Sequence, residues 1–390
     1  MKILALHNKY LVAGGEDQSH LTEIALLKRL GHSVDEYTVD NEVIEKHSLF
    51  KIALNTIWSR TYYYRIKKLL AKKEYNLVII QNYFPLLSPS VHYAIKSSGV
   101  PVVQFLRNYR YFCLNGFALR KGEPCQACLG KAPWRGVLHA CYRNNRWASL
   151  IVALMLITHR ISRTWQRKVD IFIALTKFSK NINARAGLPK EKIIIKPNFI
   201  YPEPKSGGGA GNYFLFVGRL SEEKGIKILL QAWQLLNGIN ILKIAGAGPL
   251  LDFVKHMSAS FPSIEYLGRC SSSEVATLMK NARFLIFPSL WYEGMPRTII
   301  ESFSVGTPVL ASNIGAAKEL VEEGKTGCFF EPGNPESLAQ KVLTLVAEPA
   351  IGERMRQYAR QEFKEKYTLE KNSSVWLDLF DILPIPNHQK

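Results

Sequence analysis

Short apolar runs typical of β-strands alternate with helical stretches along the whole chain, and this alternation constrains the fold most strongly. Before residue 200 the strand-like runs are Ile3–Leu6, Leu77–Ile80, Val100–Phe105, Ile171–Leu175 and Ile193–Ile195. The pattern restarts after residue 212 with "YFLFVGRL", "NILKIAGAGP", "IEYLGRC", "ARFLIFPS" and "TPVLASN". Such alternation predicts parallel sheets with helices on both faces, which bind ligands at the carboxyl ends of their strands.

A stretch rich in proline and glycine, "YPEPKSGGGAGN" (201–212), interrupts the pattern and is typical of a linker. We expect an α/β protein with two doubly wound, Rossmann-like parallel-sheet domains facing across a cleft. The predicted divisions are residues 1–200, a linker at 201–211, residues 212–365, and a helix at 366–390 that returns to the first domain. A chain of 390 residues, 47% of them apolar, can form two such cores.

The formal net charge of +19 lies entirely in the first half of the chain. Residues 1–200 contain 31 Lys and Arg against 12 Asp and Glu, whereas residues 201–390 contain 20 of each. Eight basic residues and no acidic residue lie between Glu45 and Glu74, and the same holds between Glu123 and Asp170. A solvated basic face and attraction to an anionic membrane or polyanion both explain this pattern.

No apolar run approaches the roughly 20 residues that cross a bilayer, the longest being 148–157. The start "MKILALHN" indicates a first strand rather than a signal peptide, because no small-residue cleavage site follows it. We therefore expect a cytoplasmic protein, peripheral on the inner face of the cell membrane.

The segment "WYEGMPRTIIE" (291–301) carries two glutamates, Glu293 and Glu301, in an E-x7-E arrangement. Pro296 suits the first position of a helix, so backbone N–H groups at Gly294, Met295 and the residue after the proline face outward with a partial positive charge. The two carboxylates are too far apart along the helix for a hydrolase acid–base pair and suit a hydroxyl-rich ligand gripped at two places. The alternative is that Glu293 complements the helix dipole and Glu301 is a surface residue.

Two cations lie five residues apart in "FVGRLSEEKG", Arg219 at a strand end and Lys224 at the next helix. Together they can hold a diphosphate, Arg through its planar fork and Lys as a point charge. Ordinary surface residues are the alternative for each one singly. The turns "AGAGP" (245–249) and "AGGED" (13–17) follow strands and let a ligand approach the backbone, although neither has the spacing of a dinucleotide fingerprint.

Together, "GRLSEEKG", "AGAGP", "YLGRC", "FPSLWYEGMPRTIIESFSVGTPVLAS" and the early "GGED" resemble the retaining glycosyltransferases of family four (glycosyl transferases group 1), which have the GT-B fold. The resemblance implies that the second domain binds a nucleotide-diphosphate sugar and the first domain the acceptor. Arg219, Lys224 and Glu293 are then the catalytic residues. The implied donor-binding residues are Gly14, Gly15, Gly246, Arg269, Cys270, Gly294, Met295, Pro296 and Glu301.

In this family retention is attributed to front-face attack, in which the departing phosphate assists deprotonation of the acceptor and no protein nucleophile or cofactor is required. Many relatives carry a histidine after the strand that matches "VPVVQFL", whereas this chain has Arg107 there. Arg107 and Asn108 are the candidate acceptor-side residues. The expected acceptor is a growing glycan on a membrane-embedded lipid carrier.

Four cysteines lie within a predicted insert near 113–141, spaced as C-x11-C-x2-C-x12-C at Cys113, Cys125, Cys128 and Cys141. In a cytosolic chain this spacing is compatible with a structural zinc ion, and His139 can replace one ligand. The alternative, favoured equally, is that the four cysteines are ordinary buried thiols that bind no metal.

The segment 55–73 places Trp58, Tyr62, Ile66 and Leu69 on one helical stripe beside basic residues, as in an interfacial helix. A surface helix packing on its own sheet has the same stripe and is slightly favoured. Two rivals to a lipid-linked glycosyltransferase remain: a soluble glycoside synthase of the same fold, and a zinc-bearing nucleic-acid-binding protein. No basic stripe with regularly interleaved stacking aromatics supports the latter, so we expect no nucleic-acid partner.

Overall fold

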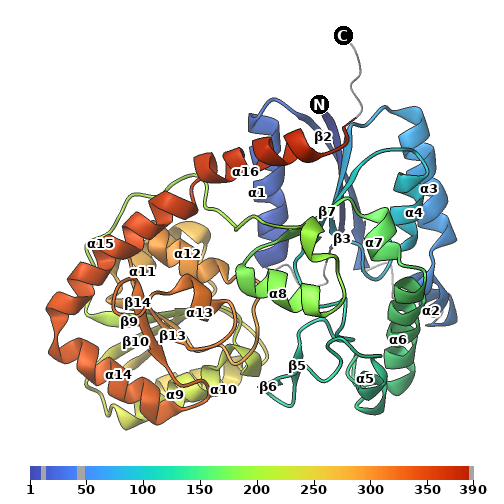
Figure 1. Cartoon of the computed structure of the whole chain (residues 1–390). Helices are drawn as coiled ribbons and strands as arrows, with labels where there is room; N and C mark the ends of the chain where they lie inside the picture. The colour runs from blue at the N-terminus through green and yellow to red at the C-terminus, as the bar shows by residue number, and fades with distance from the viewer. Residues whose placement is uncertain (10–14, 42–48, 386–390) are drawn as a thin grey trace. The chain divides into compact units, whose positions relative to one another are not determined.

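The computed structural model describes residues 1–9, 15–41 and 49–385, which form two compact units (Figure 1). Unit 1 comprises Met1–Ala118, Cys125–Pro197 and the C-terminal residues from Asn372. Unit 2 comprises Asn198–Lys371 together with the short segment Leu119–Pro124. The chain therefore passes from unit 1 into unit 2 after Pro197 and returns to unit 1 at Asn372.

Unit 1 is built on a six-stranded sheet with the order β2-β1-β3-β4-β7-β8, in which every pairing is parallel. The strands are β1 (Lys2–Lys9), β2 (Ser33–Asp40), β3 (Leu77–Asn82), β4 (Val102–Leu106), β7 (Ile171–Ala174) and β8 (Ile193–Ile195). All residues of β3 and β4 are buried, as expected for central strands covered on both faces. Every strand predicted for the first half is present, and the edge strand β2 is additional.

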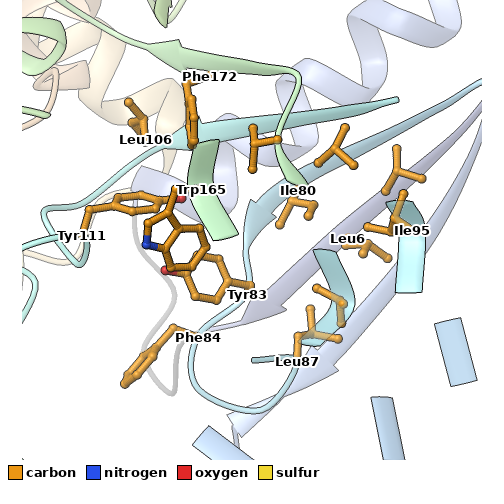
Figure 2. Packing of buried hydrophobic residues seen from close by; sticks show 14 of the residues in the cluster. Leu6, Ile80, Tyr83, Phe84, Leu87, Ile95, Leu106, Tyr111, Trp165 and Phe172 are labelled. Carbon is orange, nitrogen blue, oxygen red and sulfur yellow. The ribbon is translucent and has the colours of Figure 1, made fainter. Parts of the chain in front are cut away.

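Helices cover both faces of this sheet, as the alternation of strands and helices requires. They are α1 (Gly15–Arg29), α2 (Leu49–Ile57), α3 (Arg60–Lys72), α4 (Ser90–Lys96), α5 (Trp134–Leu138), α6 (Arg146–Ile161), α7 (Thr164–Lys168), α8 (Lys177–Arg185) and α16 (Leu369–Ile382). A 3₁₀ turn η2 (Lys190–Lys192) precedes β8. Figure 2 shows the apolar core on one face of the sheet, where Leu6, Ile80 and Ile95 pack, and the aromatic end around Tyr83, Tyr111 and Trp165.

Helix α16 is fixed to unit 1 by a buried polar cluster. The ammonium group of Lys196 lies 2.5 Å from Glu23 Oε1 and 3.0 Å from Asn372 Oδ1, and the indole N–H of Trp376 donates to Glu23 Oε2 at 2.9 Å. Lys196 and Trp376 are fully buried, and two residues of α16 thus form hydrogen bonds with this buried ion pair.

Unit 2 contains a second six-stranded parallel sheet with the order β11-β10-β9-β12-β13-β14. Its strands are β9 (Tyr213–Val217), β10 (Ile241–Ala245), β11 (Ile264–Gly268), β12 (Phe284–Phe287), β13 (Val309–Ser312) and β14 (Gly327–Phe330). Its helices are η3 (Glu222–Lys224), α9 (Ile226–Leu235), α10 (Leu251–Ser260), α11 (Ser272–Asn281), α12 (Arg297–Ser304), α13 (Ala317–Leu320), α14 (Pro335–Ala347) and α15 (Pro349–Lys366). A two-stranded hairpin, β5 (Leu119–Arg120) with β6 (Glu123–Pro124), stands apart from both sheets. Two Rossmann-like parallel-sheet units confirm the predicted fold class.

The glycine-rich stretch predicted as a linker packs against unit 2. The amides of Gly207, Gly209 and Gly211 donate to the carbonyls of Val305, Lys280 and Asn281 at 2.8, 3.0 and 2.9 Å. A Cβ atom at Gly209 would stand 2.1 Å from the guanidinium of Arg356, and one at Gly211 would stand 2.8 Å from the Asn281 carbonyl. Close packing therefore leaves little room for a side chain at Gly209 or Gly211, whereas a Cβ atom at Gly208 would meet no atom within 4 Å.

Candidate functional site

Lys224 and Glu293 form an ion pair beyond the carboxyl end of β9. The Lys224 ammonium donates to Glu293 Oε1 at 2.6 Å and stands 5.7 Å from the centre of the Trp291 ring. Ser289 Oγ donates to the same carboxylate oxygen at 2.9 Å. Both charged side chains are largely buried, so the pair holds each group in a defined orientation.

The backbone around Lys224 requires glycine at the next position. Gly225 adopts φ +72°, and a Cβ atom there would stand 1.9 Å from the Pro288 carbonyl oxygen. This contact brings the turn before α9 against the loop after β12, which carries Glu293. The close approach of these two loops explains how residues 69 positions apart in sequence form one ion pair.

Arg219 lies on the same loop, two residues after β9, and its side chain is exposed. The loop is held by the glycine-rich turn after β10: Gly218 and Leu220 donate to the carbonyls of Ala245 and Ala247 at 3.1 and 3.0 Å. Gly246 adopts φ +152°, and a Cβ atom there would stand 1.9 Å from the Gly218 carbonyl oxygen. This glycine is needed because the two loops touch, a reason that the sequence pattern did not reveal.

The second glutamate of the E-x7-E segment has a different partner. Glu301 Oε1 lies 3.3 Å from Arg297 Nε one turn earlier on α12, and its side chain is about one-third exposed at 31%. Helix α12 begins at Arg297, immediately after Pro296, within one residue of the predicted start.

Met295 is buried, and its sulfur accepts the backbone N–H of Asn198 at 3.0 Å. Gly294 precedes it in the same loop.

Arg269 and Cys270 follow β11 at the same edge of the sheet. Arg269 is exposed, and Cys270 is half-buried directly before the capping box of Ser271 and Glu274 that starts α11. The Tyr266 hydroxyl on β11 donates to the Gly246 carbonyl at 3.0 Å, which joins this strand to the glycine-rich turn. The donor-side candidates thus lie on loops at the carboxyl ends of neighbouring strands.

In unit 1, Gly14 lies outside the described residues, and Gly15 is the first residue of α1. Sequence reasoning missed two histidines beside this turn. His7 Nε2 lies 2.8 Å from Asp17 Oδ1, and the rings of His7 and His20 stack with centroids 4.5 Å apart. Burial, with a smaller contribution from the charge of Arg107, lowers the pKa of both imidazoles, that of His20 to about 3. The position of His7 near the end of the first strand was the sequence feature that could have identified it as a candidate site residue.

Arg107 follows β4 and lines a small pocket at the strand ends of unit 1. Its Nε donates to Gln81 Oε1 at 3.1 Å, and its guanidinium lies 4.5 Å from the centre of the Phe105 ring. Asn108 accepts the backbone N–H of Arg110 at 3.1 Å through its side-chain oxygen. Besides these residues, the pocket is lined by Asn82, Tyr83, Phe84, Gln104 and Tyr111.

The four clustered cysteines lie in the segment between β4 and α6, and all four are half-buried. Burial raises the pKa of the Cys113 thiol, and burial together with Cys113 and Cys125 raises that of Cys128. Across the part of the chain that the structure describes, no three His, Cys, Asp or Glu side chains are placed to hold a metal ion, and this includes Cys141 and His139. A structural zinc ion remains a prediction.

Most of the stripe predicted as an interfacial helix packs against its own unit, although Trp58, which precedes α3, is 37% exposed. Ile66 is buried, and Tyr62 and Leu69 pack against the unit 1 core. Trp58 contacts Tyr93 with ring centroids 5.0 Å apart. The packing alternative is therefore the correct reading of α3.

Residues 203–362, most of unit 2, match the family model described as Glycosyl transferases group 1. The match covers less than half of the chain, whereas the GT-B fold extends over both parallel-sheet units. An Anabaena protein, HepE, whose crystal structure contains UDP-glucose, superposes on this chain with a TM-score of 0.70 at 18% sequence identity. The superposition covers 98% of this chain and 99% of HepE.

Two sequence relatives are also glycosyltransferases by description. An uncharacterised glycosyltransferase of Methanocaldococcus jannaschii is 31% identical over 205 residues, 52% of this chain and 56% of the relative. The D-rhamnosyltransferase WbpZ of Pseudomonas aeruginosa is 29% identical over 161 residues, 40% of this chain and 42% of the relative. These alignments span about half the length of each relative.

Proposed function

We propose that the protein is a retaining glycosyltransferase that moves a sugar from a nucleotide diphosphate to an acceptor hydroxyl. The single observation that carries the proposal is the Lys224–Glu293 ion pair at the strand ends of a group 1 glycosyltransferase domain. In the proposal, one ligand with a phosphate and sugar hydroxyls contacts both this cation and this hydrogen-bond acceptor.

In the proposed reaction, the acceptor oxygen forms a bond to the anomeric carbon while the bond from that carbon to the diphosphate breaks. The departing phosphate oxygen takes the proton of the acceptor hydroxyl. Negative charge grows on the diphosphate, so the exposed Arg219 and the oriented Lys224 stabilise the transition state more than the ground state. No protein nucleophile takes part.

In the proposal, the ion pair orients the side chains of Lys224 and Glu293 before the donor binds. Glu293 holds Lys224 in place before the donor arrives, and the same carboxylate can accept hydrogen bonds from the donor sugar. We assign Glu301, on α12, to the ribose hydroxyls. The HepE structure contains UDP-glucose, which makes a uridine donor the first choice for testing.

We assign the acceptor to unit 1, at the pocket lined by Arg107 and Asn108. A growing glycan on a lipid carrier suits this assignment, because such carriers bear phosphate groups and unit 1 carries the excess of positive charge. In this proposal the enzyme works as a peripheral protein on the inner face of the membrane. No described helix has the length and apolar character needed to cross a bilayer.

Calorimetric titration with a panel of nucleotide diphosphates and their sugars tests the donor assignment. We expect saturable binding of at least one nucleotide diphosphate, and loss of that binding in Lys224→Ala. Once a donor is known, NMR of the product determines the anomeric configuration. Failure of every nucleotide to bind, with a folded protein, would rule out the proposed function.

A further inference from the structure

Helix α6 exposes an apolar stripe along its whole length. Trp147, Leu154 and Ile161 are exposed and lie seven residues apart, which places them within about 40° of one another around the helix axis. Trp147 and Ile161 are 77% and 78% exposed, and at 1.5 Å per residue the stripe is about 21 Å long. Large apolar side chains in this pattern are costly in water unless they serve an interaction.

Two of the helices that pack against α6 contribute further exposed apolar side chains. Short helix α5 exposes Trp134 and Leu138, the latter at 69%, and α2 exposes Leu54. Figure 1 shows α5 and α2 next to α6 within unit 1. We name the exposed residues of these three helices the α6 face.

The α6 face is surrounded by positive charge. The eight basic residues between Glu123 and Asp170 include Arg146 at the start of α6 and Arg163 just after its end, both exposed. Arg135 on α5 and Arg143 before α6 are also exposed. Within the described parts of the chain, none of these four arginines forms an ion pair.

Exposed apolar side chains flanked by arginines favour an anionic lipid surface over other partners. Aliphatic side chains such as Leu138 and Ile161 gain free energy by leaving water but cannot stack on nucleic-acid bases as aromatic rings do. Tryptophan at an edge between apolar and charged groups is typical of membrane interfaces. At 16 residues, α6 is about 24 Å long and suits a position in the plane of the interface.

We propose that the α6 face binds an anionic membrane surface, with Trp147, Leu154 and Ile161 entering the headgroup region and the flanking arginines contacting lipid phosphates. The consequence for catalysis, that docking brings unit 1 to a lipid-linked acceptor, rests on the proposed function. The docking itself does not, because it depends only on this surface.

Flotation with vesicles of phosphatidylcholine alone, or mixed with phosphatidylglycerol, tests the proposal. Wild-type protein should float with the mixed vesicles at low salt and release in part as salt rises, since charge attraction is screened within about 10 Å at 0.1 M. The variant Arg146→Glu/Arg163→Glu should lower binding to mixed vesicles about tenfold or more. Its matched control is Lys255→Glu/Arg354→Glu in unit 2, which changes the net charge equally at two exposed positions and should bind like wild type.

The apolar contribution is tested separately with Ile161→Asn. This variant should lose the binding that persists at high salt, whereas Ile239→Asn, at a position 60% exposed in unit 2, should not. Vesicles containing brominated lipid should quench tryptophan fluorescence in wild type and quench it less in Trp147→Phe, because bromine quenches only rings within contact range.

Equal binding of the two charge-reversal variants, or no wild-type binding to anionic vesicles at low salt, overturns the proposal. A dimer in sedimentation experiments that Ile161→Asn dissolves, without vesicle binding, would assign the face to a second copy of the chain instead. Binding to an RNA oligonucleotide but not to vesicles would assign the surface to nucleic acid and likewise overturn it. Vesicle binding without nucleotide binding would leave this inference intact and remove only the proposed function.

Discussion

The ammonium group of Lys224 sits between the carboxylate of Glu293 and the ring of Trp291, while Arg219 on the same loop reaches solvent. Before any ligand binds, the side chain of Lys224 is therefore held in one orientation, whereas the exposed side chain of Arg219 can change conformation. Both are assigned to the departing diphosphate, so removal of either should act on the transition state more than on folding.

We expect Arg219→Ala and Lys224→Ala each to lower kcat/KM by an amount equivalent to about 2–4 kcal/mol. Steady-state kinetics with the donor identified by calorimetry measures this loss. Lys227→Ala is the control, because Lys227 forms an exposed ion pair with Glu222 at 2.5 Å on the same segment. Near-wild-type turnover in both test variants would contradict the donor-site assignment.

The separate partners of the two glutamates predict separate effects. Glu301 is paired with Arg297 on α12, and Glu293 with Lys224 in the loop. Glu301→Gln should weaken the binding of free nucleotide diphosphate, whereas Glu293→Gln should chiefly impair turnover of the nucleotide sugar. Calorimetry with the sugar-free nucleotide distinguishes them, and equal losses of affinity would refute the division of roles.

His20 and His7 give unit 1 a pH-dependent stability. Burial lowers the pKa of both rings, that of His20 to about 3, although Asp17 opposes the shift and Glu36 lies 3.7 Å from His20. The unfolded chain takes up protons near pH 6.5 that the folded state excludes, so the free energy of unfolding should decrease as the pH falls from 6.5 toward 3.

Urea denaturation at pH 7 and pH 5 measures this change. In His20→Gln the decrease between the two pH values should be smaller than in wild type. Replacement of the exposed His139 by Gln is the control and should leave the decrease unchanged. A pH profile that His20→Gln does not alter would mean that other groups set the acid limit.

At the scale of elements, the start of α12 and the strands of both sheets other than β2 and β14 were predictable, because buried strands are continuous apolar runs and proline marks a helix start. Strand β2 was not, because its sequence "SVDEYTVD" alternates polar and apolar residues at a sheet edge, where one face meets solvent. The packing of Gly207, Gly209 and Gly211 on unit 2 was also hidden, since composition does not distinguish a close approach from a flexible linker.

The contact between the turns after β9 and β10 predicts an intolerance to side chains at Gly246. Gly246→Ala forces a Cβ atom to within 1.9 Å of the Gly218 carbonyl and should destabilise unit 2 by about 2 kcal/mol or more. Gly208→Ala is the control, because no atom lies within 4 Å of the added Cβ. Chemical denaturation compares them, and equal midpoints would show that the loops can separate at little cost.

The cysteine segment carries a prediction of its own. A zinc ion bound by Cys113, Cys125, Cys128 and Cys141 requires thiolates, whereas burial now favours the protonated thiols of Cys113 and Cys128. If zinc binds, metal analysis of protein purified without an affinity metal column should find about one ion per chain, and chelation should loosen this segment. Four thiols that titrate freely in the native protein, with little metal, would leave ordinary buried cysteines as the explanation.

At the scale of the whole molecule, the two units differed in how far their function could be predicted. Unit 2 carries its donor-site candidates in short motifs that the sequence reveals, although the fold is needed to pair Lys224 with Glu293, 69 positions away. The pocket of unit 1 combines residues from β3, β4 and the loop after each, including the charged Arg107. Such a site depends on tertiary structure, and only the fold brings its members together.

The return of the chain to unit 1 at Asn372 has a consequence for synthesis on the ribosome. The main segment of unit 2, Asn198–Lys371, is contiguous and is synthesised before Asn372 and the rest of α16. Until Asn372 and Trp376 emerge, the buried charges of Lys196 and Glu23 lack two of their hydrogen-bond partners. Unit 1 therefore begins to be synthesised first, but its buried hydrogen bonds are completed only after the main segment of unit 2 has been synthesised.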